Sequence, residues 1–419
     1  MSERARFSRD VWWNVAGLAI AGAAGILLNY LISVVHGAAA LGAFNQVFAV
    51  YIVLSQLGAL GIHYSALRHL AAVSDEGERR AITSAALVTT AVVGALFSAA
   101  GWLLAEPIGR VVDSPAVAVG IRYAAPGVLF FALSKVTLAC INALQRMRWY
   151  AVLTGGRFLL MVLAFGGFAL AEVDAARLPL LITVAEGSVL LLSLVPIGGL
   201  VGRVPLAALR SWIHEHLRFG LKGFSSGLVA ELNTRIDVLI LGAFAGDRVV
   251  GAYSFAAILA EGLYQVLVVL RTNFAPVVIR LWAGNRRDEL VATVRRVRDR
   301  TYLGSLVVGA LAIGVYALVV PLITRDPLLA DSWRYFALLV AGMVASAGYA
   351  PFLPLLLYAG LPGWYTILIA TTFAANAIGN LALVPALGAS GSALGTAFAF
   401  LVGLVALKWM SARLLDLQI

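Results

Sequence analysis

The sequence predicts an all-α integral membrane protein with about 12 transmembrane helices, arranged as two parallel six-helix lobes around a central cavity. Three observations predict this fold class: the composition, the apolar runs that recur along the chain, and motifs of the first half that return in the second. Of the 419 residues, 61% are hydrophobic and only 12% are charged, and the mean hydropathy is +0.93. An ordinary soluble domain is about 25% charged, so a soluble core could not bury this much apolar surface.

The apolar runs have the length of membrane helices, which need roughly 20 residues to cross the hydrocarbon layer. A transmembrane barrel would instead show segments of about ten residues with alternating polarity, and the sequence lacks them. The first run is long enough to remain as a span rather than to be removed as a signal peptide. We predict twelve spans, at residues 11–35, 43–67, 81–104, 117–143, 151–172, 178–201, 219–245, 251–270, 301–323, 333–358, 365–385 and 391–412.

The loops between these spans differ strongly in positive charge. One side carries 22 Lys and Arg residues, eight of them between Arg271 and Arg300, and the other side carries five: Arg110, Arg177, Arg248, Arg325 and Arg334. Because Lys and Arg concentrate in cytoplasmic loops, the first side is predicted to be cytoplasmic, with both termini inside. The net charge of +10 comes mostly from this bias. It is spread over short loops, so it does not indicate a nucleic-acid partner.

The chain is predicted to divide into an N-terminal lobe at 1–201, a cytoplasmic linker at 202–218 and a C-terminal lobe at 219–419. The linker reads as an amphipathic helix, with Leu206 and Trp212 on its apolar face, and we expect it to lie on the membrane surface. The linker and the arginine-rich loop have two interpretations: anchors at the cytoplasmic surface, or surfaces that recruit substrate headgroups.

Internal repeats support the two-lobe plan. The four residues 41–44, Leu-Gly-Ala-Phe, return 209 positions later as Val-Gly-Ala-Tyr at 250–253, and Gln56 meets Gln265 at the same offset. Two further matches follow in order: Arg122-Tyr123 with Arg334-Tyr335, and Trp149-Tyr150 with Trp364-Tyr365. Six spans per repeat bring the second half into the membrane in the same orientation as the first. Transporters built this way place their substrate at the lobe interface near the midplane.

Strongly polar residues within the predicted spans mark the candidate site, because a charge at the bilayer centre costs at least about 2.5–3.5 kcal/mol. They should face a wet cavity or each other. The predicted span at 219–245 is the most unusual, because it holds four of them. The candidates are Lys135, Arg157, Glu186, Glu231, Asn233, Arg235, Asp237 and Glu261.

Several motifs resemble those of the bacterial polysaccharide-repeat (O-antigen, Wzx-type) flippases of the multidrug/oligosaccharidyl-lipid/polysaccharide exporter superfamily. These are the closing stretch at 380–409, the Gly-Ala-Phe and Gly-Ala-Tyr openings of the second and eighth spans, and the Ile236-Asp237 pair with the apolar run after it. The resemblance implies two six-helix lobes around a cavity that opens alternately to each side. It implies a cargo oligosaccharide on an undecaprenyl-diphosphate carrier, in the bacterial inner membrane. Lipid II flippases of this superfamily often have fourteen spans, so twelve spans disfavour a peptidoglycan role.

A diphosphate that crosses in such a cavity would need cations, and Lys and Arg suit phosphate. We therefore expect Lys135, Arg157 and Arg235 to bind the headgroup. The alternative for Arg235 is a pair with Glu231, four residues before it on a helix. For Lys135 and Arg157 the alternative is snorkelling or an internal salt bridge.

The acids have two interpretations as well: counter-ions to the arginines, or a site for a coupling H⁺ or Na⁺. Asp237 with Asn233, four residues apart, could supply two oxygen ligands of such a site, and Glu231, Glu186 and Glu261 are the other candidates. Glu261 and Gln265 could instead form hydrogen bonds across helices. No cofactor beyond such an ion is expected.

The expected function is a flippase that moves a lipid-linked glycan from the cytoplasmic to the outer leaflet. The alternatives are a multidrug exporter of the same fold and a membrane scaffold in envelope polysaccharide assembly. An enzyme is not expected, because the five histidines show no metal-site spacing beyond the pair His214 and His216, Cys140 is alone, and there is no phosphate-binding Walker loop. The expected partners are the lipid-linked glycan, membrane lipids and other proteins of polysaccharide assembly.

Overall fold

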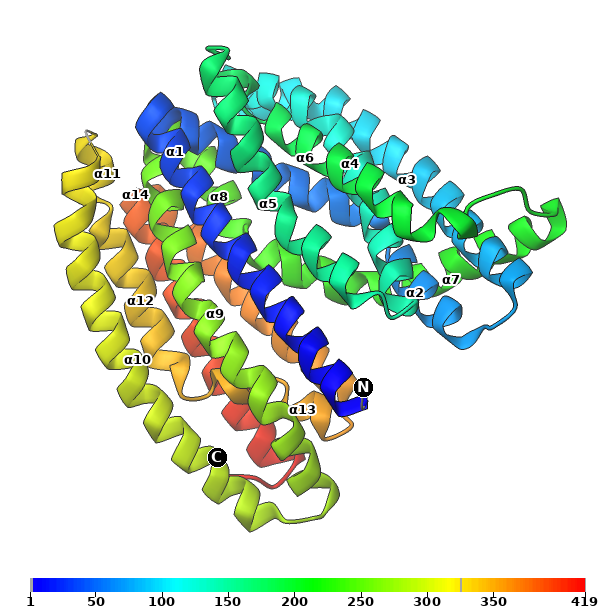
Figure 1. The fold of residues 1–419 in the computed structure, drawn as a ribbon. Coiled ribbons are helices and arrows are strands. Elements are labelled where there is room, and N and C mark those ends of the chain that lie inside the picture. The colour runs from blue at the N-terminus through cyan, green and yellow to red at the C-terminus, as the bar shows by residue number, and fades with distance from the viewer. Residues whose placement is uncertain (1–2, 325, 419) are drawn as a thin grey trace. The chain divides into compact units, whose positions relative to one another are not determined.

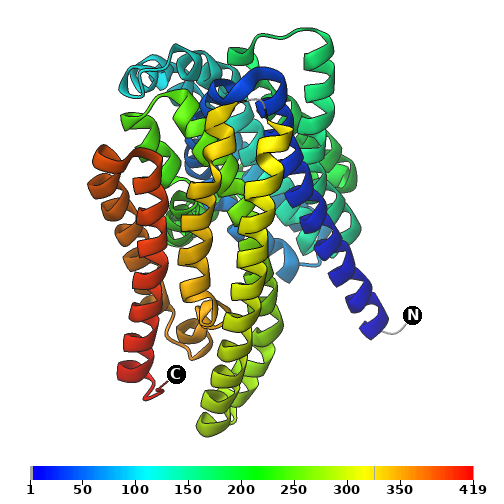
Figure 2. The ribbon, with the colours of Figure 1, turned by 90° about the vertical axis from the view of Figure 1, so that its left-hand side faces the viewer.

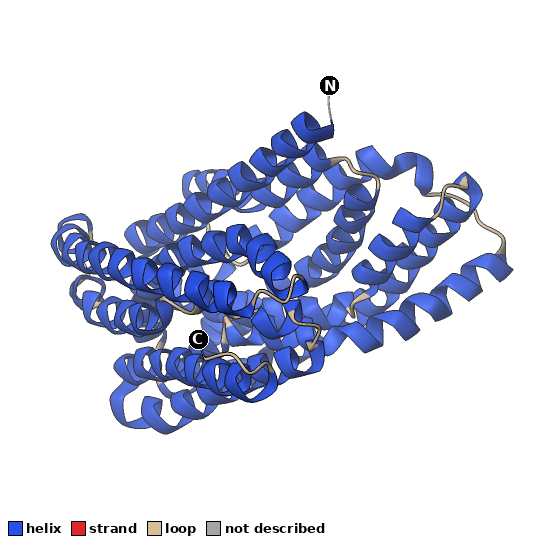
Figure 3. Cartoon of the chain, turned by 90° about the horizontal axis from the view of Figure 1, so that it is seen from below, coloured by secondary structure: helices blue, strands red, loops and turns tan. Residues whose placement is uncertain are grey.

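The computed structural model describes residues 3–324 and 326–418, and every regular element in these ranges is helical (Figure 3). The predicted all-α fold class is therefore confirmed. Arg325, which we counted on the outer side, lies outside the described residues. The α-helices are α1 (Glu3–Ala59), α2 (Ile62–Ala72), α3 (Glu76–Val111), α4 (Pro115–Ala143), α5 (Met147–Leu170), α6 (Leu180–Leu194), α7 (Leu206–Asn233), α8 (Ile236–Phe244), α9 (Asp247–Ala283), α10 (Arg287–Ile323), α11 (Pro327–Asp331), α12 (Trp333–Ala347), α13 (Leu355–Tyr358) and α14 (Pro362–Leu414). Short 3₁₀ helices lie at Ala175–Arg177, Val195–Leu200 and Ala350–Phe352.

Nine helical segments of the described chain are long and apolar enough to cross a membrane. Two of them each overlap a pair of predicted spans, because α1 and α14 continue through a single glycine where the sequence predicted a loop; the end of the predicted span 43–67 lies in α2. Gly37 (φ 85°) breaks α1 and Gly388 (φ 56°) breaks α14. Glycine can adopt this positive φ because it has no Cβ. The remaining predicted span, 219–245, is divided between α7 and α8, so each of the twelve spans coincides at least in part with a helix.

The chain forms two compact units (Figure 1). Unit 1 comprises Met1–His36 and Ala43–Glu231, and unit 2 comprises Gly37–Gly42 and Leu232–Ile419. The sequence placed the division at the linker, 202–218. In the structure the helix that contains most of this linker belongs to unit 1 as far as Glu231, whereas the short segment at 37–42 belongs to unit 2.

Unit 1 is built around α4, which packs against α2, α3 and α6. Helices in a membrane associate through close packing, so small residues at their contacts matter. Gly94 of α3 illustrates this, because a Cβ there would lie 3.4 Å from that of Ala132 on α4. In unit 2, α14 packs against α8 and α12. Its residues Leu368 and Leu407 are fully buried in a cluster with Phe352.

The helix α7 joins the linker and the first part of the predicted span 219–245 in one element. It ends at Asn233, and Arg235 precedes α8. The expectation that Glu231 and Arg235 share one helical face is therefore wrong, because the helix ends between them. This break leaves the polar residues of the predicted span at a helix junction rather than in the middle of a continuous helix.

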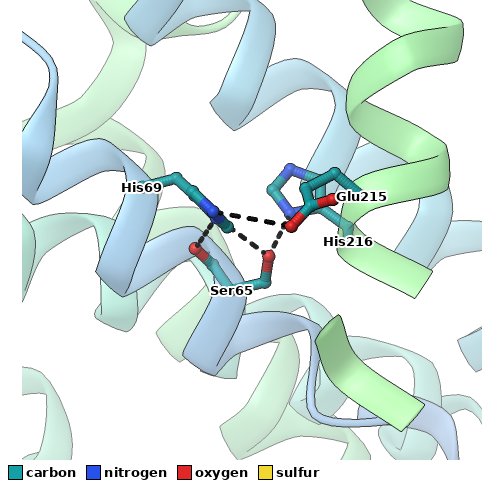
Figure 4. A network of polar contacts seen from close by, with 4 residues as sticks. All are labelled: Ser65, His69, Glu215 and His216. Atoms are coloured by element: carbon teal, nitrogen blue, oxygen red, sulfur yellow. Dashed lines mark hydrogen bonds and ion pairs between the residues drawn. The ribbon is translucent and has the colours of Figure 1, made fainter. Parts of the chain in front are cut away.

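A partly buried polar network holds the first half of α7 against α2 (Figure 4). Nε2 of His216 lies 3.1 Å from the carbonyl oxygen of Ile82, which can only accept a hydrogen bond, so Nε2 donates. Nδ1 of His216 therefore accepts from the hydroxyl of Ser65, at 2.8 Å. Nδ1 of His69 lies 3.2 Å from the same hydroxyl, and its Nε2 lies 3.7 Å from Glu215.

The sequence predicts that the linker lies with its apolar face on the membrane surface. In the structure, part of that face packs on unit 1 instead. The ring of Trp212 lies 5.2 Å from that of His69 and 5.8 Å from that of His216, so it packs on unit 1. Leu206, at the start of α7, remains exposed. The linker is thus attached to unit 1 by the polar network and by one aromatic side chain.

Candidate functional site

A polar cluster lies within the helices of unit 1, and we call it the unit 1 cluster. Its centre is an ion pair between Arg157 of α5 and Glu186 of α6, with 2.9 Å between Nε and Oε1. The Glu186 side chain is fully buried, and Arg157 is 17% exposed. The hydroxyl of Tyr51, on α1, donates a hydrogen bond of 2.8 Å to the same carboxylate oxygen. The internal salt bridge that the sequence left as the alternative for Arg157 is therefore present.

Lys135 of α4 completes the unit 1 cluster. Its Nζ donates a hydrogen bond of 2.7 Å to Oε1 of Gln56. The ring of Phe131 lies beside both cations, 5.1 Å from Nζ of Lys135 and 4.7 Å from Cζ of Arg157. Cation–π contacts of this kind stabilise a charge that has lost part of its water shell. Glu231 also interacts electrostatically with Lys135.

The unit 1 cluster has unused hydrogen-bonding capacity. Nη2 of Arg157 and Oε2 of Glu186 are buried and have no hydrogen-bond partner among the described residues. Nε of Arg157 also forms no aligned hydrogen bond, although it lies within ion-pair distance of Glu186. A buried donor without a partner is costly. Nη2 of Arg157 is therefore able to donate to an anionic ligand without first giving up an existing hydrogen bond.

Unit 2 contains a separate cavity of about 270 Å³ at the junction of α7 and α8, which we call the unit 2 cavity. Of the sequence-predicted residues, Asn233, Arg235, Asp237 and Glu261 line it, together with Gln265. Nη2 of Arg235 lies 3.6 Å from Oε2 of Glu261. Arg235 thus has a counter-ion on α9.

Asp237 lies in the first turn of α8, where its side chain is held by several groups. The hydroxyl of Tyr253 donates to Oδ2 at 2.5 Å, and the backbone N–H of Val238 donates to Oδ1 at 2.9 Å. Ser392 of α14 contacts the backbone carbonyl of Asp237 at 3.5 Å. Asp237 is 8% exposed, and it lines the unit 2 cavity.

Side-chain amides extend this network across α14. Nδ2 of Asn376 donates to the backbone carbonyl of Asn233 at 3.2 Å, and Nδ2 of Asn380 donates to Oδ1 of Asn376 at 2.9 Å. Ser392 donates to Oδ1 of Asn380 at 2.7 Å. Of these residues, Asn233 and Asn376 line the unit 2 cavity. Within the described residues no group of three or more His, Cys, Asp or Glu side chains could hold a metal ion.

The structure thus sorts the predicted residues into two groups. Lys135, Arg157 and Glu186 meet in the unit 1 cluster, where Glu231 acts on Lys135 electrostatically. The other four, Asn233, Arg235, Asp237 and Glu261, line the unit 2 cavity.

Sequence reasoning missed the tyrosines and the amides. Tyr51 and Tyr253 each donate to a buried carboxylate, and neither was identified. Tyr253 could have been found, because it is the last residue of the repeated motif Val-Gly-Ala-Tyr. Asn376 and Asn380 are spaced by four residues in an apolar stretch, which places them on one helical face. Tyr51 has no such signal, because only the tertiary fold brings it to Glu186.

Comparison with solved structures finds transporters. A lipid II flippase, MurJ, in an inward-closed conformation has a TM-score of 0.75 at 13% identity, with 96% of this chain and 88% of that chain covered. An inward-facing multidrug resistance MATE family transporter of the MOP superfamily has a TM-score of 0.76 at 15% identity, with 96% and 95% covered. A MOP superfamily transporter from Pyrococcus furiosus, with a binding pocket described as reversed in polarity, has a TM-score of 0.58 at 14% identity, with 97% and 95% covered.

At these identities the likeness establishes the fold alone. Comparison with curated proteins finds no match. A family described as "Polysaccharide biosynthesis protein" matches residues 8–282, which is more than half of the chain. The sequence, the helical fold and this match agree, and the chain therefore belongs to the polysaccharide biosynthesis protein family.

Proposed function

We propose that this membrane transporter is a flippase for an undecaprenyl-diphosphate-linked oligosaccharide, such as an O-antigen repeat unit of lipopolysaccharide, in the bacterial inner membrane. It moves the glycan from the cytoplasmic to the outer leaflet, and both of its termini are cytoplasmic. The family match and the fold shared with a lipid II flippase support a lipid-linked cargo. Other proteins of polysaccharide assembly are its expected partners, and it performs no chemical step of its own.

The observation that carries this proposal is the pair of cations in the unit 1 cluster. Lys135 and Arg157 both contact the ring of Phe131, and they belong to helices that are long and apolar enough to cross a membrane. Nη2 of Arg157 is a buried donor that has no partner in the part of the chain that the structure describes. A diphosphate offers charged acceptor oxygens to such donors, and charge-assisted hydrogen bonds are about twice as strong as neutral ones. We assign phosphate binding to Lys135 and Arg157, and to Arg235 in the unit 2 cavity.

Transport is proposed to be coupled to a cation, H⁺ or Na⁺, at Asp237 in the unit 2 cavity. The carboxylate, the amide oxygens around it and the hydroxyl of Thr396 supply the oxygen ligands that an alkali cation takes. Alternatively, Asp237 itself takes up a proton. Either event removes a buried negative charge, and it biases the transport cycle only if one conformation binds the cation better than the other.

A multidrug exporter is the second candidate, and one observation favours it. The unit 2 cavity combines acids with aromatic side chains, because Tyr264 and Phe400 line it together with Asp237 and Glu261. An organic cation would fit such a lining. The uncompensated donor of Arg157 in the unit 1 cluster favours an anionic cargo instead.

A leaflet assay tests the proposal. A lipid-linked oligosaccharide is reconstituted with the protein in vesicles, and a non-permeant glycosidase reports which leaflet holds the sugar. We expect protein-dependent exposure that falls about tenfold or more in Lys135→Ala, Arg157→Ala or Arg235→Ala, because a hydrogen bond to a charged group contributes about 1.5–3 kcal/mol. Arg248→Ala, which removes a surface arginine paired with Asp326, is the control and should keep full activity.

The same vesicles separate the alternatives. Efflux of a cationic dye without exposure of any glycan would replace the flippase by the multidrug exporter. Neither activity, with protein correctly inserted, would favour a membrane scaffold. Glycan exposure that survives in all three cation variants would keep the flippase and discard the proposed phosphate site.

A further inference from the structure

A second opening in unit 2 lies between α9 and α10, and Met343 lines both this opening and the unit 2 cavity. These helices form a long antiparallel hairpin (Figure 2), and each packs against α12. A groove of about 540 Å³ runs between them, with Met343 of α12 in its lining. This groove is part of neither the unit 1 cluster nor the unit 2 cavity.

The groove is apolar along most of its length and charged at one end. Leu263, Leu267 and Leu270 line it from α9. Arg296 and Arg300, one helical turn apart on α10, lie at the end nearer the arginine-rich turn of the hairpin. Such a lining matches a molecule with an anionic head and a long apolar tail.

The two arginines are available for a ligand. Among the described residues, neither Arg296 nor Arg300 forms a hydrogen bond or an ion pair, and both are exposed. The nearest acid in sequence, Asp299, pairs with Arg298 at 2.8 Å on another face of the helix. Arg298 also lies 3.3 Å from the hydroxyl of Tyr349.

The depth of the groove fits one leaflet of a bilayer. The predicted span begins at residue 301, directly after Arg300, so both arginines lie at the level of the lipid headgroups. From Arg300 to Gly309, the last lining residue of α10, the helix rises about 14 Å. Half of the hydrocarbon core is about 15 Å. The length of the apolar part of the groove therefore matches the thickness of the hydrocarbon layer in one leaflet.

We infer that the groove between α9 and α10 binds an anionic phospholipid of the cytoplasmic leaflet. The phosphate lies between Arg296 and Arg300, and one acyl chain lies against the leucines of α9. Gly304 leaves the space for this chain, because a Cβ there would meet no other atom of the described residues within 4 Å. This inference does not depend on which cargo the protein transports.

Native mass spectrometry tests the site. The full-length protein is reconstituted with equal amounts of phosphatidylglycerol and phosphatidylcholine, released, and weighed with the lipids that it retains. We expect about tenfold preferential retention of phosphatidylglycerol, which is the ratio that about 1.4 kcal/mol produces. The double variant Arg296→Gln/Arg300→Gln should lose this preference. Arg295→Gln, on another face of the same helix segment, should keep it, because Arg295 does not line the groove.

A second pair of variants locates the acyl chain. Gly304→Leu should fill the groove and reduce the retention of both lipids, whereas Gly314→Leu should not, because Gly314 also lies in open space but outside the groove. Equal losses in Arg295→Gln and in the double variant would overturn the site, since they would indicate diffuse attraction to an arginine-rich surface. Full retention in Gly304→Leu, or displacement of the lipid by glycerol 3-phosphate alone, would overturn the placement of the chain in the groove.

Discussion

Gly42 and Gly251 lie backbone to backbone where the segment 37–42 of α1 meets α9. A Cβ on Gly42 would lie 2.7 Å from the backbone nitrogen of Gly251, and a Cβ on Gly251 would lie 2.9 Å from that of Gly42. Each would also overlap a carbonyl oxygen, of Asp247 and of Ala38 respectively. These are the glycines of the two repeated motifs. The two copies of the motif therefore contact each other, and both need glycine at this position.

Gly42→Ala and Gly251→Ala should each destabilise the protein. Overpacking of a tight contact costs typically about 1–3 kcal/mol, and here the obstacle is backbone, which cannot move aside as a side chain can. The thermal unfolding midpoint of detergent-purified protein would measure this loss. Gly22→Ala is the matched control on α1, because a Cβ there meets nothing within 4 Å among the residues that the structure describes. Equal midpoints for all three variants would show that the contact is not tight.

Arg157→Ala should destabilise unit 1 more than Arg157→Ala combined with Glu186→Gln. The single change leaves the fully buried Glu186 carboxylate without its cation, and removal of one partner of a buried pair costs about 3–5 kcal/mol. The double change also removes the negative charge, and Tyr51 can still donate to the amide oxygen. Unfolding midpoints of the two variants would be compared with wild type. A double variant less stable than the single one would contradict an ion pair at this position.

His216 should make stability depend on pH. Its complete burial lowers its pKa from the ordinary 6.5 to about 4. Between these values the unfolded chain binds the proton and the folded chain does not, so stability falls as the pH falls from about 6.5 to 4. A shift of this size corresponds to roughly 3 kcal/mol. The network around Ser65 resists the proton as well, because Nδ1 of His216 already accepts from that hydroxyl.

The measurement is the unfolding midpoint as a function of pH. His216→Gln should flatten the profile between pH 4 and 6.5, since the amide can donate to the carbonyl of Ile82 but does not titrate. His214→Gln is the control, because His214 is exposed on the same helix. A profile in His216→Gln as steep as that of wild type would assign the dependence to other groups.

If the coupling proposal holds, Asp237→Asn should make transport independent of the cation. The amide oxygen can still accept from the Val238 N–H, its NH₂ group can donate to the Tyr253 hydroxyl, and the side chain carries no charge to be neutralised. Initial rates of glycan exposure would be measured with and without a Na⁺ gradient, and with and without a proton gradient. Asp326→Asn, a carboxylate paired with Arg248 in a loop, should leave both dependences intact. Unchanged gradient dependence in Asp237→Asn would move the coupling site elsewhere.

The candidate residues could be found in the sequence because charge in an apolar span is costly wherever the span lies. That rule identified Lys135, Arg157 and Glu186, which do meet in the structure. It could not say which residues are partners. Arg235 illustrates this, because a continuous helix would have placed it beside Glu231, whereas the break after Asn233 lets it reach Glu261.

The sequence by itself determined the membrane class, the helical spans and the repeat, because insertion into a bilayer depends directly on hydrophobicity and length, which are local properties of a segment. Only the tertiary structure decided that Gly37 and Gly388 bend helices without a loop, that Tyr51 and Tyr253 serve buried carboxylates, and that Arg296 and Arg300 share a groove. These features depend on contacts between residues far apart in the chain. Periodicity and composition do not encode such contacts, because many packings of apolar helices satisfy the same pattern.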